Sequence, residues 1–156
     1  MKTQNMVKTI RSSLLGEGNF SKEIDGIEYF IRIKDSDRYS LVISEVGMVN
    51  NQAKDPINRE QFESKVKELE KRLSSFMEQP KLIEINPQEQ IAQMRSYPPE
   101  TEQESVKYYE LFFSKGKRIN FYRIENQKGK KEKIAMILPD HLLEKLINDF
   151  TQVIKG

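Results

Sequence analysis

Alternation of apolar and polar side chains predicts a group of strands near the start of the chain. Residues 27–34 and 38–46 place apolar side chains at every second position, which is the period of a half-buried strand. Residues 20–24 precede them as a further predicted strand, and Asp25-Gly26 is a strong signal for a two-residue hairpin turn. Because such short turns join antiparallel strands, we expect an antiparallel sheet.

A helical period follows these strands, and a capping pattern marks its start. Asn58 is a good N-cap residue, and Gln61 stands three positions later, as in a capping box. Apolar side chains then recur every three or four residues, so we expect one face of this helix to be buried. They are Phe62, Val66, Leu69, Leu73 and Phe76.

The same order of elements occurs in the second half of the chain. Strands are predicted at residues 106–114, 119–125 and 132–138, and Pro139-Asp140 then begins a helix with a wide apolar face. That face comprises Leu142, Leu143, Leu146, Ile147, Phe150, Val153 and Ile154. Strands followed by a helix, twice over, indicate the α+β class.

The segment between the two halves is interrupted by prolines, namely Pro80, Pro87, Pro98 and Pro99. Proline disrupts helices and central strands, so we expect little regular structure here. A short strand at residues 81–85 and a helical turn at residues 88–95 are compatible with the pattern, and residues 98–104 are typical of an acidic linker.

These patterns divide the chain into four parts. Residues 1–18 are expected to form a flexible basic arm, because they have no acid before Glu17 and lack the apolar region of a secretory signal. Residues 19–77 form the first strands-then-helix repeat, 78–104 the linker and 105–156 the second repeat. We therefore expect an α+β domain made of two antiparallel-sheet-plus-helix repeats packed together.

A short motif occurs once in each repeat and supports this division. Each copy begins Phe-Ser-Lys and continues, after a turn, as Phe-x-Arg-Ile. Since side chains two apart share a face of a strand, each phenylalanine shares a face with a cation. The four pairs are Phe20 with Lys22, Phe30 with Arg32, Phe113 with Lys115, and Phe121 with Arg123. The opposite face, expected to be core, carries Tyr29, Ile31, Ile33, Tyr122 and Ile124.

Composition restricts the chemistry that the protein can perform. The chain of 156 residues has no cysteine and one histidine, which excludes disulfides, thiolate metal sites and zinc sites of standard composition. That histidine, His141, is expected in the solvated first turn of a helix. No catalytic motif with characteristic spacing is present, and Asp35 and Asp37 lack the remaining ligands of a calcium loop. We expect a protein that is not an enzyme and uses no cofactor.

Charge and hydropathy add two expectations about surroundings and partners. The formal net charge is only +2, so any affinity for phosphate must come from local clustering of lysine and arginine. No apolar run is long enough to span a membrane, so no membrane association is expected. The composition is compatible with a cytoplasmic protein, and a nucleoid-associated or organellar location stays open.

The repeated motif resembles a known family. Residues 29–33 (Tyr-Phe-Ile-Arg-Ile), followed by a polar turn and residues 41–45 (Leu-Val-Ile-Ser-Glu), resemble the PUR repeat of purine-rich-element-binding proteins. Residues 121–130 are similar again, and Lys115-Gly116-Lys117 looks like an element of the related Whirly proteins. The resemblance implies a curved antiparallel sheet followed by a helix, two such units packed through crossed helices, and single-stranded nucleic acid bound on the sheet.

Two interpretations of the aromatic and cationic face remain open. In the first, its rings stack on bases and its cations contact phosphates of single-stranded DNA or RNA. The candidate residues are Phe20, Lys22, Phe30, Arg32, Phe113, Lys115, Lys117, Arg118, Phe121, Arg123 and Lys130. In the second, the phenylalanines pack beneath the helices and the arginines lie at the margin of the sheet. A protein-protein interaction or assembly module with the same α+β fold is the alternative function. Either interpretation leaves a homodimer open.

Overall fold

A computed structural model describes residues 6–13, 18–53, 57–74, 76 and 80–155. The helices in this part of the chain are α1 (Met6–Ser13), α2 (Arg59–Leu73) and α3 (Asp140–Lys155). The strands of the first half are β1 (Gly18–Ile24), β2 (Ile27–Ser36) and β3 (Ser40–Asn50). Those of the second half are β4 (Pro80–Asn86), β5 (Ile91–Ser96), β6 (Glu100–Glu102), β7 (Ser105–Ser114), β8 (Arg118–Gln127), β9 (Lys130–Ile134) and β10 (Met136–Pro139).

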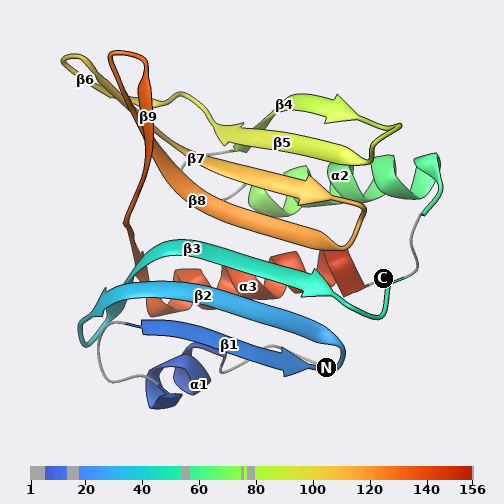
Figure 1. Cartoon of the computed structure of the whole chain (residues 1–156), viewed down its shortest axis with the longest axis horizontal. Coiled ribbons are helices and arrows are strands. Elements are labelled where there is room, and N and C mark those ends of the chain that lie inside the picture. The colour runs from blue at the N-terminus through green and yellow to red at the C-terminus, as the bar shows by residue number, and fades with distance from the viewer. Residues whose placement is uncertain (1–5, 14–17, 54–56, 75, 77–79, 156) are drawn as a thin grey trace.

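All the described strands belong to one antiparallel sheet (Figure 1). Its main path runs in the order β1-β2-β3-β8-β7-β5-β4, while β6 pairs with β7, β9 with β8 and β10 with β3. The predicted α+β class is therefore confirmed. Among the described residues, no helix combines the length and the apolar character needed to cross a membrane.

The local signals in the first half are largely confirmed. Asp25 and Gly26 both have positive φ, 51° and 82°, as a type I′ hairpin turn between β1 and β2 requires. Asn58 accepts from the backbone of Gln61 and Gln61 reaches back to Asn58, so the capping box is present. β3 continues further than predicted, because residues 46–49 pair with β8 and become a central part of the sheet.

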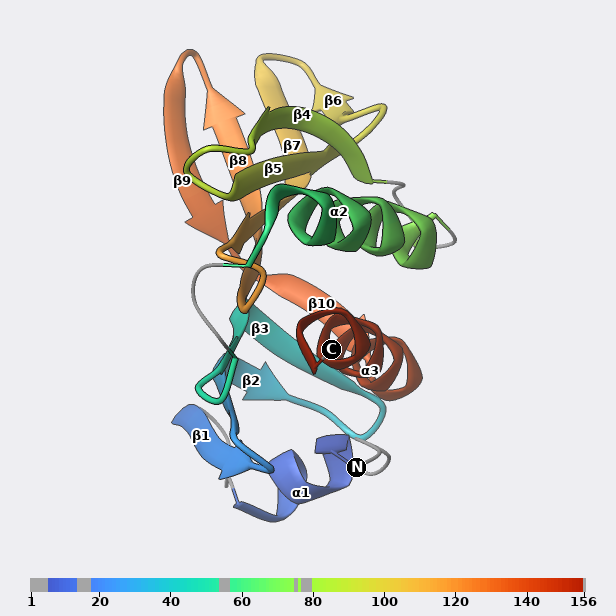
Figure 2. The ribbon, with the colours of Figure 1, turned by 90° about the vertical axis from the view of Figure 1, so that its right-hand side faces the viewer.

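Helices α2 and α3 lie on one side of the sheet, each over the half from which it does not come (Figure 2). From α2, Phe62 stacks on Phe113 of β7 with ring centroids 5.7 Å apart. From α3, Thr151 makes a 3.0 Å hydrogen bond with the Tyr29 hydroxyl of β2, and the Ile154 carbonyl accepts from Asn50 of β3. The first helix therefore covers later strands and the last helix covers earlier ones.

The prediction of a flexible arm is wrong for residues 6–13. They form helix α1, whose Met6, Val7 and Ile10 are buried. Its Arg11 side chain donates to both oxygens of Asp140 at 2.6 and 2.8 Å, which anchors α1 to the start of α3. Three apolar residues at helical spacing are enough to bury this short segment once α3 provides a surface. The remainder of the predicted arm up to residue 17 lies outside the described residues.

The proline-rich segment is also more regular than predicted, so the expectation of a linker is wrong from residue 80 onward. Pro80 begins β4 and Pro87 lies in the turn to β5, while the last two prolines fall between β5 and β6. Each is placed where a sheet tolerates proline. Residues 91–95 of the predicted helical turn instead belong to β5, whose Ala92, Met94 and Ser96 are buried at every second position, and residues 88–90 lie in the turn before it.

The strand predicted at residues 132–138 is divided between two partners. β9 pairs with β8 and ends at Ile134, whereas β10 begins at Met136 and pairs with β3. The chain thus crosses at Ala135 from one half of the sheet to the other before α3 begins at Asp140, as predicted.

Candidate nucleic-acid interface

The face of the sheet opposite α2 and α3, here called the open face, carries a row of half-buried side chains. The strand register places Phe30 beside Gly47, Gly47 beside Asn120, Asn120 beside Phe112, and Phe112 beside Gln93. These five positions belong to β2, β3, β8, β7 and β5, neighbouring strands in Figure 1. The row therefore places two aromatic rings and two amides on one continuous surface.

Gly47 is the position that accommodates the Phe30 ring. A Cβ atom added at Gly47 would collide with the ring carbons of Phe30. The ring consequently fills the space that a side chain at Gly47 would need, so any other residue there would displace it.

We expect Gly47→Ala to push the Phe30 ring toward solvent and to cost about 1 kcal/mol of folding free energy, the lower end of overpacking penalties, because the half-exposed ring can move. Urea unfolding of the variant measures this cost. In the background of Phe30→Ala the same substitution should cost much less, since the colliding atoms are gone. An equal cost in both backgrounds would contradict this placement of the ring.

A second row on the open face centres on Glu110. Its carboxylate is nearly buried and accepts from Gln93 Nε2 at 2.6 Å and from Arg95 Nε at 3.1 Å. Tyr122 lies beside Glu110 in the register. Burial, and then the negative charge of Glu110, raise the pKa of the Tyr122 phenol. Tyr122 therefore stays a neutral, half-buried ring at physiological pH.

Glu45 is the second acid near the centre of the open face, and it too has donors. Its carboxylate accepts from Asn120 Nδ2 at 2.8 Å and from Lys133 Nζ at 2.9 Å. The Lys133 ammonium also lies 4.3 Å from the centre of the Tyr122 ring. Because Glu45 and Glu110 are each paired with a cation, they repel a phosphate chain less than free carboxylates would.

Three of the predicted stacking residues lie in the core instead. Phe20, Phe113 and Phe121 are buried on the helix side of the sheet. Phe113 packs on Phe62 of α2, and Phe121 contacts the rings of Phe76, Tyr109 and Phe150. The prediction that these rings share an accessible face with Phe30 is therefore wrong, and no base can stack on them in this structure.

Arg123 lies on the helix side of the sheet, like Phe121. The prediction that Arg123 contacts phosphate on an accessible face is therefore wrong in this structure. The residue is only 8% exposed, its guanidinium lies 4.4 Å from the Tyr109 ring centre, and its Nη2 pairs with Glu100 at 2.8 Å. Tyr122 and Ile124, expected on the core face, share the open face with Glu110 and Tyr108, where Tyr122 is half-buried and Ile124 is 7% exposed. Phe20 and Phe113 thus share the helix side, whereas the Phe-x-Arg-Ile parts of the two motif copies present opposite faces, since a one-residue shift in register reverses every side chain.

The other predicted residues are spread over several places. Phe30 and Arg32 lie on the open face, as does Arg118, which pairs in register with Val49. The remaining cations lie elsewhere: Lys22 is exposed on β1, Lys115 and Lys117 are in the β7–β8 turn, and Lys130 begins β9, where it pairs with Glu132. The structure therefore brings together Phe30, Arg32 and Arg118 and separates them from the rest.

Sequence reasoning missed several residues of the open face, namely Arg95, Tyr108, Phe112, Tyr122 and Lys133. One signal could have located part of this set. Glu110 interrupts the apolar run of β7, and a carboxylate in such a run marks the uncovered face of a strand. Positions 108 and 112 share that face by alternation.

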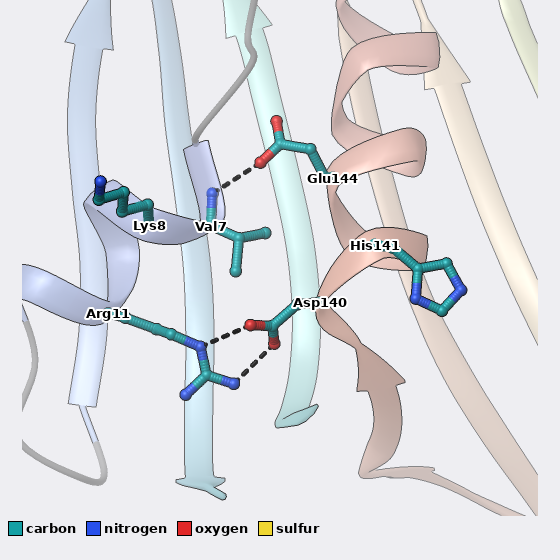
Figure 3. Close-up of a pocket in the computed structure, with 6 residues that line it drawn as sticks. All are labelled: Val7, Lys8, Arg11, Asp140, His141 and Glu144. Carbon is teal, nitrogen blue, oxygen red and sulfur yellow. Dashed lines mark hydrogen bonds and ion pairs between the residues drawn. The ribbon is translucent and has the colours of Figure 1, made fainter. Parts of the chain in front are cut away.

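A second candidate site lies between α1 and α3, where a cavity of about 370 Å³ is lined by Val7, Lys8, Arg11, Asp140, His141 and Glu144 (Figure 3). Arg11 pairs with Asp140, and a carboxylate oxygen of Glu144 accepts from the Val7 backbone at 2.9 Å. The His141 ring points away from this pair in Figure 3. These contacts attach α1 to α3. The residues that line the cavity do not place a general base beside a nucleophile. Nowhere among the described residues do three or more metal-binding side chains cluster.

No match to this chain was found among known protein families, curated proteins or solved structures. The resemblance to PUR and Whirly repeats therefore stays a prediction drawn from the sequence motif. A functional proposal for this chain therefore has to be argued from the structure of its described residues.

Proposed function

We propose that this protein binds single-stranded DNA or RNA on the open face, with no catalytic step. The observation that carries the proposal is the set of half-buried rings Phe30, Phe112 and Tyr122 on a sheet face that α2 and α3 do not cover. Aromatic rings on such a surface stack with unpaired bases, each stack contributing ~1–3 kcal/mol without strong sequence preference.

The cations around these rings support a modest contribution of phosphate contacts to the binding affinity. Arg32 and Arg118 are exposed on the open face, and Lys133 lies beside Tyr122. For three phosphate contacts to a single strand, the logarithm of affinity should fall with the logarithm of salt concentration with a slope of about −2. The small net charge of the chain fits such a shallow slope better than a steep one.

Fluorescence anisotropy of labelled single-stranded DNA and RNA at low and moderate salt tests the proposal. We expect salt-sensitive binding that Phe30→Ala weakens about tenfold, since one stacked base is lost. Tyr39→Ala is the matched control, because Tyr39 is an exposed aromatic residue in the β2–β3 turn, away from the row. Circular dichroism verifies that both variants are folded.

Absence of binding at low salt would overturn the proposal, and so would equal losses in the two variants. The better function would then be a protein-protein interaction module. Strand β4 supports that alternative, because it ends the main path of the sheet and exposes Ile83 and Ile85. An edge strand with exposed apolar side chains is a common place for another chain to add.

A further inference from the structure

A cleft of about 340 Å³ is lined by residues of β4, β5, β7, β8 and β9 and of the segment between β5 and β6. Its lining is mainly apolar and aromatic, with a few polar groups: Ile83, Arg95, Ser96, Tyr97, Pro99, Val106, Tyr108, Asn126 and Lys131. This volume lies at the lower end of small-ligand pockets, and it suits one planar ring system better than a folded partner.

We propose that this cleft receives one unpaired nucleobase of a bound single strand, with its phosphate held at the rim by Lys131 or Arg95. This inference rests on the proposed function, and it adds a defined subsite to the otherwise unspecific open face. Three features of the cleft support it: its aromatic walls, a free amide donor and its connection to the two rows described above.

Tyr97 and Tyr108 supply the aromatic walls. Tyr97 is 61% exposed, with the Lys81 ammonium 4.9 Å from its ring centre, so much of a large ring is left in water. Tyr108 is only 6% exposed and has the Arg95 guanidinium 4.8 Å from its ring centre. Because the Tyr108 ring is already covered by Arg95, a base entering the cleft would stack on the free surface of Tyr97.

Asn126 supplies a donor suited to a base edge. Its Oδ1 accepts from the Gly129 backbone at 3.0 Å, which fixes the orientation of the amide. Its Nδ2 has no partner among the described residues and can donate to a ring nitrogen or carbonyl oxygen of a base. Lys131 faces Asn126 in the register and is exposed, so a cation lies next to this donor.

Arg95 connects the cleft with the rows of the open face. Its Nε contacts Glu110, the neighbour of Tyr122, while its guanidinium lies over Tyr108 in the cleft. Lys131 and Asn126 lie on β9 and β8 in register with Val106 of β7. A single-stranded nucleic acid whose bases stack on Phe112 and Tyr122 can therefore continue along the same face into the cleft.

Anisotropy with a labelled oligothymidine, together with amide NMR of the full chain titrated with thymidine monophosphate, tests the inference. Tyr97→Ala should weaken oligonucleotide binding about tenfold, whereas Tyr97→Phe should keep it, because stacking needs the ring and not the hydroxyl. Thymidine monophosphate should shift the amides of Tyr97, Val106 and Asn126, and deoxyribose phosphate, which lacks the base, should not. Tyr39→Ala again serves as the control, since Tyr39 is also exposed beneath an arginine.

The outcomes separate this inference from the proposed function. If the oligonucleotide binds and Phe30→Ala weakens it, but Tyr97→Ala does not, the cleft is not a base site and the open face still is. If the shifts with deoxyribose phosphate equal those with the nucleotide, the cleft recognises phosphate alone and the inference fails. If no oligonucleotide binds to the wild type, both fail together.

Discussion

Phe121→Ala should lower the free energy of unfolding by about 3–5 kcal/mol, the range for removing a buried aromatic ring. Phe121 is 1% exposed and lies at the centre of an aromatic cluster in the core. Its ring contacts Tyr109, Phe76 and Phe150 with centroid separations of 5.5, 5.7 and 5.6 Å. These partners come from β7, from the end of the α2 region and from α3, so the cavity would loosen three elements at once.

Urea unfolding followed by circular dichroism measures this loss, and Phe30→Ala is its matched control. Phe30 occupies the same position of the sequence motif, but it is half-buried on the open face, so its loss should be much smaller. Equal losses of stability in the two variants would contradict the assignment of the two rings to opposite faces.

Arg123→Ala should cost about 2 kcal/mol of stability and leave the salt dependence of nucleic-acid binding unchanged. The guanidinium is withdrawn from solvent over the Tyr109 ring, where a cation–π contact contributes about 1–2 kcal/mol. Its ion pair with Glu100 adds less, because Glu100 is more than half exposed and is rehydrated when the arginine is removed. The stem of the arginine adds packing against the same surface.

Arg32→Ala provides the comparison for this second substitution. Arg32 is exposed on β2, and its removal should change stability by no more than about 0.5 kcal/mol while reducing the salt slope of binding by about 0.7. Unfolding curves and anisotropy titrations over a salt series report the two quantities. A variant of Arg123 that stays fully stable but loses salt-sensitive binding would show that this arginine contacts phosphate.

The features that sequence predicts well here are local. The Asp25-Gly26 turn and the Asn58 cap each depend on residues within three positions of one another, so the chemistry of a short stretch decides them. The buried stripes of α2 and α3 follow in the same way from helical periodicity. The α+β class then follows from the order of these elements.

Which face of the sheet a given side chain occupies depends on pairing with strands far away in the chain. This is the part of the prediction that was wrong. Alternation shows that Phe121 and Arg123 share a face, but only pairing with β3 and β7 decides which face. The repeated motif suggested that Phe121 and Phe30 lie on the same face of the sheet. In the structure Phe121 is buried in the core on the opposite face. Glu110 could have indicated the correct face. A carboxylate packed against the apolar faces of α2 and α3 would be costly, so its side of β7 has to be the uncovered one.

The exchange of helices between the two halves of the sheet makes each half dependent on the other. A fragment ending after α2 would contain β1, β2 and β3 without α3, the helix that covers Tyr29 and Asn50. A fragment starting at β4 would lack the ring that stacks on Phe113. Neither fragment could close its own core, so the chain should fold and unfold as a single cooperative unit. A binding surface that crosses from β2 to β5 would thus be assembled only when the whole domain is complete.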